Sequence, residues 1–363
     1  RQMCIRDRPE VEPGANTYPD FEFLVAQTVL AVDHLQGTAH LEGWDIDDKR
    51  LREELDSLAL LPVAARPTAP QRERIRAVAD VDDAGFRADV DKLKGNIHAG
   101  DIYQVVPARA FTVECPNALA AYRALRETNP SPYMFYVRGA AYELFGASPE
   151  SNLKFTPEDR QIQLYPIAGT RPRGLNPDGS INHELDIRNE LEMRTDQKEI
   201  AEHTMLVDLA RNDLARVAVP RSRQVAELLH VDRYSRVMHL VSRVTATLHP
   251  DFDALDAYRA CMNMGTLTGA PKLRATELIR RTEGKRRGSY GGAGGYLRGD
   301  GAMDNCIVIR SAYVQDGTAV VQAGAGVVKD SVPQAEADET VHKAYAVLHA
   351  IAMAHGAELE VQR

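Results

Sequence analysis

The sequence lacks the features typical of membrane-spanning, secreted and metal-cluster proteins. Its 363 residues contain four cysteines, Cys4, Cys115, Cys261 and Cys306, and none of them forms a C-x-x-C pair. Such scattered cysteines argue against a disulfide framework or a zinc cluster and suit the reducing cytoplasm. A membrane-spanning helix needs a run of about 18 apolar residues, which is missing. The opening residues also lack the apolar core of a signal peptide.

An excess of positive charge is missing as well. Lysine and arginine number 44 against 52 acidic residues, which gives a net charge of -8. This balance argues against nucleic acid or an anionic membrane as the main partner. An acidic protein that binds an anion must build a positive site locally, from a metal ion, arginines or backbone N–H groups. Hydrophobic residues make up 44% and charged residues 26%, as in ordinary globular proteins.

Composition along the chain indicates two boundaries. Residues 1–17 show neither helical nor strand periodicity, so we interpret them as a loop or a non-native leader. "PVAARPTAPQRER" (62–74) is the only linker-like stretch, and Pro/Arg-rich segments of this kind often separate domains. We therefore assign residues 18–83 to the remainder of an N-terminal region and residues 84–357 to the principal domain.

Strands are predicted in consecutive groups instead of in strict alternation with helices. That order favours an α+β fold with antiparallel sheets over a doubly wound parallel fold. The predicted helices include 182–214, with a break, 253–261, 271–282 and 333–355. The predicted strands include 21–34, 102–113, 224–231, 236–248, 292–298, 303–314 and 318–323.

Two predicted helices carry the same E-x-x-E arrangement beside apolar residues. Glu199 and Glu202 share a helix side with Leu206, and Glu336 and Glu339 open the last helix. Solvated surface charge, or the dipole at a helix N-terminus, would explain either pair alone. Four carboxylates facing each other would repel strongly without a cation, and their hard oxygens suit Mg²⁺. Neither helix has the His or Cys spacing expected for zinc.

Three glycine-rich segments adjoin predicted strands: "PIAGTRPRG" (166–174), "SYGGAGGY" (289–296) and "AGAGVVKDS" (323–331). None matches a phosphate-binding loop or a dinucleotide fingerprint, which disfavours a nucleotide-binding protein. Tight turns would explain each segment alone. Glycines nevertheless let backbone N–H groups approach an anion closely, and local positive charge comes from Arg171, Arg173 and Arg310.

From about Phe21 to its C-terminus, the chain resembles the chorismate-utilising enzymes, most closely component I of anthranilate synthase. The motifs that carry the resemblance are "PIAGTRPRG", "DQKEIAEHTMLVDLARNDLARV", "VMHLVSRV", "GTLTGAPK", "SYGGAGGY", "DNCIVIRSA" and "AGAGVVKDSVPQAEADET". The resemblance implies an α/β sandwich of antiparallel sheets with the active site between them, in a chorismate-binding catalytic domain at 84–357. It also implies a lyase of tryptophan biosynthesis that forms anthranilate and pyruvate from chorismate and ammonia.

The resemblance assigns roles to individual residues. Glu202 and Glu339 correspond to direct Mg²⁺ ligands, with Glu199 and Glu336 behind them. Glu150 resembles the acid that protonates the leaving hydroxyl. His239 resembles the histidine associated with enolpyruvate elimination, although a histidine in an apolar strand is more often simply bonded to a carbonyl. Glu199 and Thr266 complete the catalytic set, and the substrate contacts are Gly169, Thr170, Tyr290, Arg310, Gly324, Ala325, Gly326 and Lys343.

Two positions help to choose among relatives. Relatives that add water to chorismate carry a lysine base where this chain has Gln104, so isochorismate synthesis is disfavoured. Relatives that aminate the hydroxyl-bearing ring carbon carry a lysine where this chain has Ala168, which favours anthranilate and leaves aminodeoxychorismate synthase component I as the alternative. A protein that binds a small anion without turnover is a further alternative. The ammonia is expected from a separate glutamine amidotransferase subunit, because no cysteine here lies in a nucleophile-elbow pattern.

"SPYMFY" (131–136) resembles one wall of a tryptophan feedback site, formed by Pro132, Tyr133 and Met134. An ordinary aromatic strand would explain the same pattern. The serine-containing "LLES" motif of the other wall is missing, and members of the family are longer at the N-terminus. We therefore expect an apparent N-terminal truncation that leaves catalysis intact and impairs tryptophan inhibition.

Overall fold

The computed structural model describes residues 11–44, 47–59, 73–234 and 237–363, and the chain divides into two units. The smaller unit, Pro19–Ala69, contains an antiparallel hairpin of β1 (Thr28–Asp33) and β2 (Thr38–Gly43), followed by α1 (Asp48–Ala59). The predicted strand at 21–34 therefore forms only in its second half. The larger unit, Arg1–Tyr18 with Pro70–Arg363, contains the other elements.

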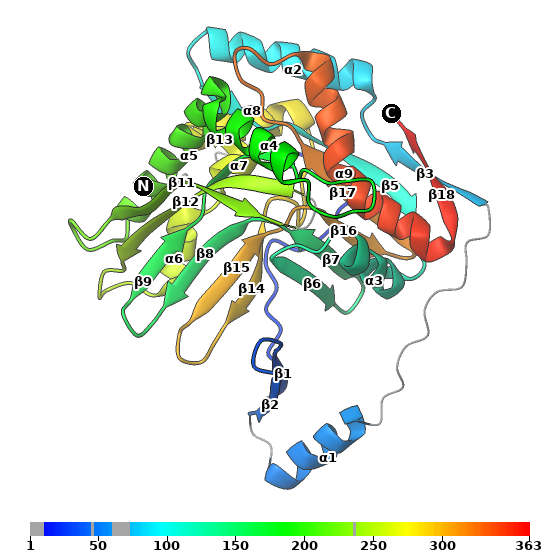
Figure 1. Cartoon of the computed structure of the whole chain (residues 1–363), viewed down its shortest axis with the longest axis vertical. Helices are drawn as coiled ribbons and strands as arrows, with labels where there is room; N and C mark the ends of the chain where they lie inside the picture. Colours follow the sequence, from blue (N-terminus) through cyan, green and yellow to red (C-terminus); the bar gives the residue numbers. More distant parts are fainter. Residues whose placement is uncertain (1–10, 45–46, 60–72, 235–236) are drawn as a thin grey trace. The chain divides into compact units, whose positions relative to one another are not determined.

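The first sheet of the larger unit is an antiparallel arrangement of seven strands (Figure 1). Its spatial order is β10 (Ile167–Pro172), β12 (Val237–Thr247), β9 (Gln161–Leu164), β8 (Ser151–Thr156), β15 (Met303–Ile307) and β14 (Ala293–Leu297), with β11 (Gln224–Arg233) also paired to β12. β12 is rich in the β-branched residues valine and threonine, which suit a strand. Its register places His239 opposite Thr170 of β10.

The second sheet also has seven strands. Its order is β18 (Ala357–Gln362), β3 (Glu73–Ala79), β5 (Ala108–Glu114), β17 (Thr318–Gly324), β16 (Ser311–Gln315), β7 (Glu143–Ser148) and β6 (Tyr133–Arg138). β18 and β3 pair in parallel, and the other neighbours are antiparallel. Because β3 and β18 belong to this sheet, the unit extends beyond residues 84–357 at both ends.

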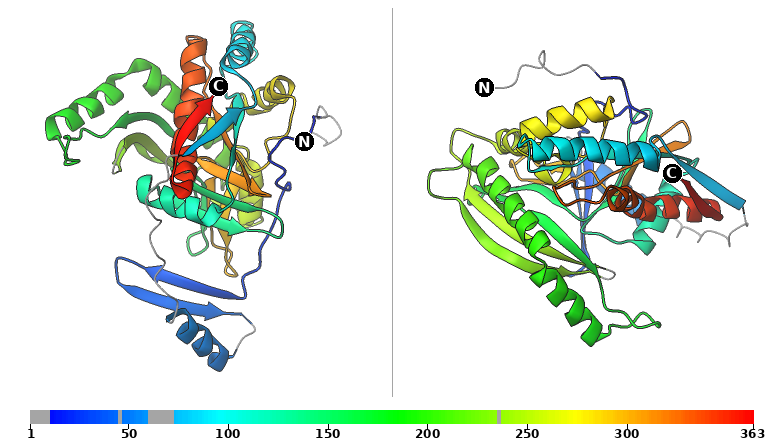
Figure 2. Two further views of the ribbon diagram at one scale, coloured as in Figure 1. Left: turned by 90° about the vertical axis from the view of Figure 1, so that its right-hand side faces the viewer. Right: turned by 90° about the horizontal axis from the view of Figure 1, so that it is seen from above.

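Helices cover both sheets (Figure 2). The second sheet forms its core with α3 (Ala118–Thr128) and α9 (Pro333–His355), and α2 (Asp83–His98) lies against α9. α4 (His183–Thr195) and α5 (Gln197–Ala215) lie against β10 and β12. Asp196 explains the predicted break in this helical segment, because its carboxylate caps α5 by accepting the N–H groups of Lys198 and Glu199.

The sheets are linked where the predicted strand 303–314 divides into β15 and β16. Between these strands Arg310 has a φ of 49°, a left-handed conformation that interrupts a regular strand. The predicted strand 102–113 also divides, into β4 (Gln104–Val105) and β5, at Pro107. β4 pairs with β13 (Gly269–Ala270), which follows α6 (Ala254–Cys261) and α7 (Gly265–Thr268) and precedes α8 (Lys272–Glu283).

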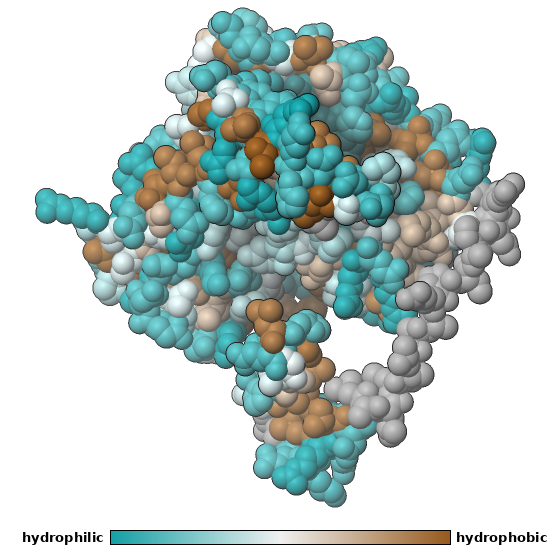
Figure 3. Space-filling model, in the orientation of Figure 1, coloured by the Kyte–Doolittle hydropathy of each residue, from teal (hydrophilic) through white to brown (hydrophobic). Residues whose placement is uncertain are grey.

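Residues 11–17 are irregular, as predicted, but they pack onto the larger unit. The Asn16 side chain is 5% exposed and donates hydrogen bonds to Ser289 Oγ and Gln322 Oε1 at 2.9 and 3.0 Å. Residues 1–10 lie outside the described part of the chain, and so does most of the predicted linker. Hydrophilic residues cover most of the face in Figure 3, with smaller apolar patches between them. Within the described residues, no helix is long and apolar enough to span a membrane.

Candidate active site

The two E-x-x-E pairs come together although they lie on different helices. Burial raises the pKa of Glu202 on α5, and the negative charges of Glu339, Glu336 and Glu199 raise it further. Burial likewise raises the pKa of Glu336, with an added contribution from Glu339. The glutamates of α5 and α9 thus lie close enough for their charges to influence one another, and we refer to the four as the carboxylate cluster.

Each pair has one member with a cationic partner. Glu199 forms an ion pair with Arg171 Nη1, and Glu339 Oε1 lies 2.5 Å from Lys343 Nζ. Glu199 Oε2 and Glu336 Oε2 are buried without a hydrogen-bond partner among the described residues. Buried carboxylate oxygens of this kind need a cation or a proton, because an unpaired buried charge is strongly unfavourable.

This donor set fits Mg²⁺ better than zinc. Among the described residues, no three acidic, histidine or cysteine side chains already converge at metal-binding spacing. Mg²⁺ commonly binds through one or two carboxylates, with waters and substrate oxygens completing its shell. Two ligands from the cluster, with the unpartnered oxygens of Glu199 and Glu336 behind them, match that preference.

Glu150, between β7 and β8, is a buried carboxyl with a perturbed pKa. It is 6% exposed, and its Oε1 has no hydrogen-bond partner in the part of the chain that the structure describes. Burial raises its pKa to about 7, against the opposing effects of the Thr266 hydroxyl, Lys343 and Arg310. The Thr266 hydroxyl faces this carboxyl but also lacks a partner at hydrogen-bond geometry. Glu150 can therefore hold a proton at neutral pH and donate it.

His239 on β12 is held as a neutral imidazole. Burial and the positive charge of Arg310 lower its pKa to about 4. Its Nδ1 lies 2.9 Å from Thr170 Oγ1, across the β10–β12 ladder, and the Tyr234 ring lies 5.6 Å away between centroids. An uncharged imidazole with one nitrogen engaged can accept a proton on the other.

Two cations lie near these acids. The Arg310 guanidinium has no hydrogen bond or ion pair within the described chain, although Tyr290, Glu339 and Glu150 are close enough to influence its pKa. Burial removes water from the guanidinium and thereby lowers its pKa, and no direct partner among the described residues replaces that water. Lys343 Nζ donates to Gly324 O at 3.0 Å in addition to its contact with Glu339. Both cations suit the carboxylates of an anionic ligand.

The glycines of the predicted substrate contacts lie where side chains would collide. A Cβ at Gly324 would come within 2.7 Å of Pro107 O and 3.0 Å of Tyr290 Oη, and one at Gly169 within 2.9 Å of Glu199 Oε2. Gly169 also has a φ of +89°. Burial raises the pKa of the Tyr290 hydroxyl to about 12, and the nearby Gly324 backbone opposes part of that rise. Ala325 is fully buried beside them.

The two selectivity positions also border this region. Gln104 is 6% exposed, its Oε1 is unpartnered, and its Nε2 lies 3.0 Å from where a Cβ at Gly326 would be. Ala168 precedes Gly169 on β10, and its carbonyl lies 3.3 Å from His203 Nδ1. Neither side chain can act as a base or a nucleophile.

Tyr133 and Met134 begin β6, at the edge of the second sheet, and Pro132 directly precedes them. The Tyr133 hydroxyl donates to Asp304 Oδ1 at 3.0 Å, and Met134 packs against the core of that sheet. A regular strand accounts for this arrangement, and the tryptophan site stays a prediction.

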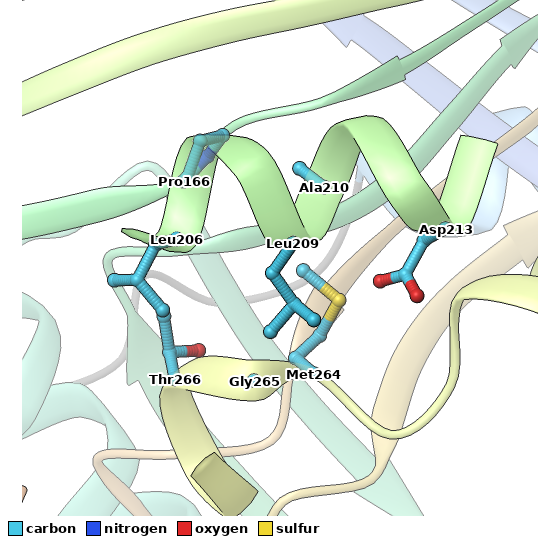
Figure 4. Close-up of a pocket in the computed structure, with 8 residues that line it drawn as sticks. All are labelled: Pro166, Leu206, Leu209, Ala210, Asp213, Met264, Gly265 and Thr266. Carbon is cyan, nitrogen blue, oxygen red and sulfur yellow. The ribbon is translucent and has the colours of Figure 1, made fainter. Parts of the chain in front are cut away.

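A small cleft opens beside Thr266, between α5 and the segment that leads into α7 (Figure 4). Apolar side chains from both sides line it, together with Asp213 and the threonine. A Cβ at Gly265 would come within 2.0 Å of Leu209 Cδ2, so a larger residue here would require that leucine side chain to move. Helical spacing puts Asp213 on the side of α5 that carries Glu199 and Glu202 but does not indicate a partner for it. The structure supplies one, Lys272 of the "GTLTGAPK" motif.

The sequence matches the chorismate binding enzyme family over residues 2–349. The chain belongs to the chorismate-binding enzyme family. Component 1 of anthranilate synthase from Escherichia coli strain K12 is 54% identical over 361 residues, which cover 98% of this chain and 69% of that protein. The Vibrio parahaemolyticus protein of the same name is 56% identical over 349 residues, covering 94% of this chain and 64% of its own length.

Solved structures agree with this membership. Anthranilate synthase component I from Streptococcus pneumoniae TIGR4 superposes with a TM-score of 0.84 at 32% identity, over 93% of this chain and 76% of that one. The menaquinone-specific isochorismate synthase of Escherichia coli has a TM-score of 0.71 at 23% identity, over 87% and 72%, and shares the fold. The predicted family and the predicted α+β class are confirmed. This chorismate-binding family member is an enzyme of the anthranilate synthase component I type.

Proposed function

We propose that this enzyme converts chorismate and ammonia to anthranilate, pyruvate and water, with Mg²⁺ as cofactor. The observation that carries the proposal is Glu150, a buried carboxyl with a pKa of about 7 beside two cations. Such a group can remain protonated next to a bound anion. The relatives at over 50% identity, all named anthranilate synthase component 1, support the same reaction.

Substrate binding uses the local positive charge of an otherwise acidic protein. Chorismate carries two carboxylates, and Arg310 and Lys343 are the cations placed to meet anions at this site. Backbone N–H groups at Gly169 and Gly326 can approach an anion closely because these glycines carry no side chain. On anion binding, the desolvated Arg310 gains the partner that it lacks in the free protein.

Amination begins with loss of the ring hydroxyl. Ammonia attacks the ring carbon next to the carboxylate-bearing carbon, the ring double bonds shift, and the hydroxyl leaves with the proton of Glu150 as water. The ring-bound ammonium group then loses one proton to solvent, and Glu150 takes up one proton again before the next turnover. General acids of this kind contribute about 10²–10⁴-fold to a rate. Thr266, which faces Glu150, is placed to orient that carboxyl.

Elimination then makes the ring aromatic. The ring carbon that gained nitrogen loses its proton, and the C–O bond to the enolpyruvyl group breaks with its electron pair leaving on oxygen. Neutral His239, oriented by Thr170, is placed to accept that proton. The enolpyruvate takes up a proton to become pyruvate.

The cofactor proposal rests on the carboxylate cluster. Glu202 and Glu339 would hold Mg²⁺, with Glu199 and Glu336 orienting them, and the metal would neutralise a carboxylate of the substrate. Lys343, now bound to Glu339, would then be free to contact chorismate. Metal binding would also remove the repulsion that raises the pKa of Glu202.

Ammonia is favoured over the other nucleophiles used by related enzymes. Gln104 cannot deprotonate water, so hydration of chorismate lacks a base. Ala168 cannot form a covalent bond to the ring. We further propose that a separate glutamine amidotransferase subunit supplies the ammonia.

The products identify the reaction directly. The purified chain, incubated with chorismate, ammonium and Mg²⁺, is expected to give anthranilate and pyruvate in equal amounts by mass spectrometry. Glutamine in place of ammonium should give almost none until the partner subunit is added. Aminodeoxychorismate or isochorismate as the main product would refute the proposal, and efficient use of glutamine by the chain alone would refute the partner.

A further inference from the structure

A buried ion pair joins α5 to the segment that precedes α8. Lys272, the first residue of α8, places Nζ 2.5 Å from Asp213 Oδ2 and 2.7 Å from the carbonyl oxygen of Cys261. The side chains of Lys272 and Asp213 are 16% and 10% exposed. Lys272 thus contacts both α5 and the C-terminal end of α6.

Helix stability alone does not account for a lysine at this position. A cation in the first turn of α8 faces the positive end of that helix dipole, which is unfavourable. The lysine is favourable at the end of α6, where Cys261 O is a carbonyl that helix geometry leaves unpaired. Burying an ion pair is in general weak evidence for stability, since desolvation offsets the attraction. The pair therefore calls for a role beyond holding α8.

The chain between the two contacts carries active-site groups. Residues 262–271 leave Cys261 and return at Lys272, so the bond from Lys272 to Cys261 O closes this loop at its base. Within the loop, Thr266 faces Glu150, and β13 pairs with β4 at Gln104. Asp213, in turn, fixes the base of the loop to the helix that carries Glu199 and Glu202.

The interior of the loop is anchored from the other side. Arg287 Nη1 donates to Leu267 O at 2.8 Å, and its Nη2 donates to Val106 O at 2.6 Å. Asp213 and Thr266 line the same cleft (Figure 4), so the space between them is not filled by other side chains. Because this cleft is not filled, Thr266 could shift into it if the base of the loop moved.

We propose that Asp213 and Lys272 are positioning residues that hold Thr266 against Glu150 during turnover. The inference rests on the proposed function, because its readout is anthranilate formation. The pair acts on the chemical step and not on substrate affinity, since neither residue reaches the cations that bind the substrate. A small displacement of a catalytic group lowers kcat without comparable loss of binding.

The first test replaces the lysine in the full chain. We expect Lys272→Met to lower kcat at least about tenfold and to change KM for chorismate by less than about twofold. Lys272→Arg, which keeps a cation able to reach both oxygens, should retain most of the activity. Lys285→Met is the matched control, since Lys285 forms a 2.5 Å pair with Asp80 beyond the other end of α8. It should leave kcat unchanged.

A double-mutant cycle separates positioning from loss of stability. The neutral pair Asp213→Asn with Lys272→Met removes the unpaired buried charge, so it should keep the Tm near wild type while kcat stays low. In a Thr266→Ala background the same change should have almost no further effect, because the lysine acts through the threonine. Two results would overturn the inference. In the first, the kcat losses of Thr266→Ala and of the neutral pair multiply when the changes are combined. In the second, the neutral pair alone has the wild-type kcat. A wild-type chain that makes no anthranilate would instead count against the proposed reaction.

Discussion

The glutamate pairs of α5 and α9 share one motif but have opposite internal arrangements. On α5 the first member, Glu199, is bound to Arg171, and the second, Glu202, has a pKa raised by burial and by its neighbours. On α9 the second member, Glu339, is bound to Lys343, and the first, Glu336, is buried with an unpartnered oxygen. Equal spacing therefore places the residues on one helix side but does not assign their roles.

The comparison also separates permanent from exchangeable partners. Arg171 contacts Glu192 and Asp196 as well as Glu199, so it is fixed within the α4–α5 corner. Lys343 contacts only Glu339 and the Gly324 carbonyl among the described residues, and it lies beside the proposed substrate cradle. We expect the first ion pair to persist during turnover and the second to open when metal and chorismate bind.

The largest expected effect is at the unpaired glutamate of α5. Glu202→Gln should lower kcat/KM by about 10³-fold or more, because it removes a direct ligand to the metal that neutralises the substrate. Glu199→Gln should cost only about 10–100-fold, as is typical for groups that orient a ligand. Initial rates of anthranilate fluorescence over a Mg²⁺ series measure both. Equal losses at the two positions would remove the distinction between them.

The second effect concerns Glu150, which belongs to neither pair. Glu150→Gln should lower kcat by about 10²–10⁴-fold with little change in KM, since the amide cannot donate a proton to the leaving hydroxyl. Glu158→Gln, at an exposed turn, is the control and should behave as wild type. A variant that keeps wild-type kcat would exclude Glu150 as the acid.

The third effect is the pH dependence that follows from the same carboxyl. Its raised pKa, about 7 in the free protein, means that the active protonated form is complete below this value and is lost as pH rises through it. Bound chorismate adds negative charge, so in the complex the midpoint should lie at or above 7. The measurement is kcat at a constant concentration of free ammonia. A rate that rises without limit through this range would contradict the acid role.

The smallest expected effect is on the Tm. It compares the glutamate pairs of α5 and α9 without any substrate turnover. Burial and Glu339 raise the pKa of Glu336 in the folded protein. A raised carboxyl pKa is unfavourable to folding once pH exceeds it, so Glu336→Gln should keep or increase the Tm at neutral pH without metal. Glu199→Gln breaks an ion pair and should lower the Tm slightly. Thermal melts in EDTA would show opposite signs, and the same sign would mean that the pairs are equivalent.

The elements of the larger unit follow closely from periodicity and capping. The final helix begins at Pro333 and ends before Gly356, as the positions of proline and glycine predict. The predicted strand 303–314 was wrong, because continuous β-propensity hides the left-handed residue Arg310 at which the chain passes from one sheet to the other. β3 and β18 were missed, since their pairing joins the two ends of the unit and has no local signal.

The site was predictable in its residue types and not in its contacts. The repeated E-x-x-E spacing indicated a carboxylate cluster, and the family resemblance named its members. Glu339 pairs with Lys343 one turn further along α9, which helical spacing allows, whereas Glu199 pairs with Arg171 of β10, which only the fold brings close. The Asp213–Lys272 pair joins residues far apart in sequence, so no periodicity in either helix could have revealed it.

Metal binding by the carboxylate cluster is the central claim, and it can be measured without substrate turnover. Mn²⁺ can replace Mg²⁺ as a spectroscopic probe, and the loss of its free-ion electron paramagnetic resonance signal reports binding. We predict one Mn²⁺ bound per wild-type chain, displaced by Mg²⁺, and greatly weakened in both Glu202→Gln and Glu339→Gln. Undiminished binding in both variants would contradict the account, because the ion would then lie elsewhere.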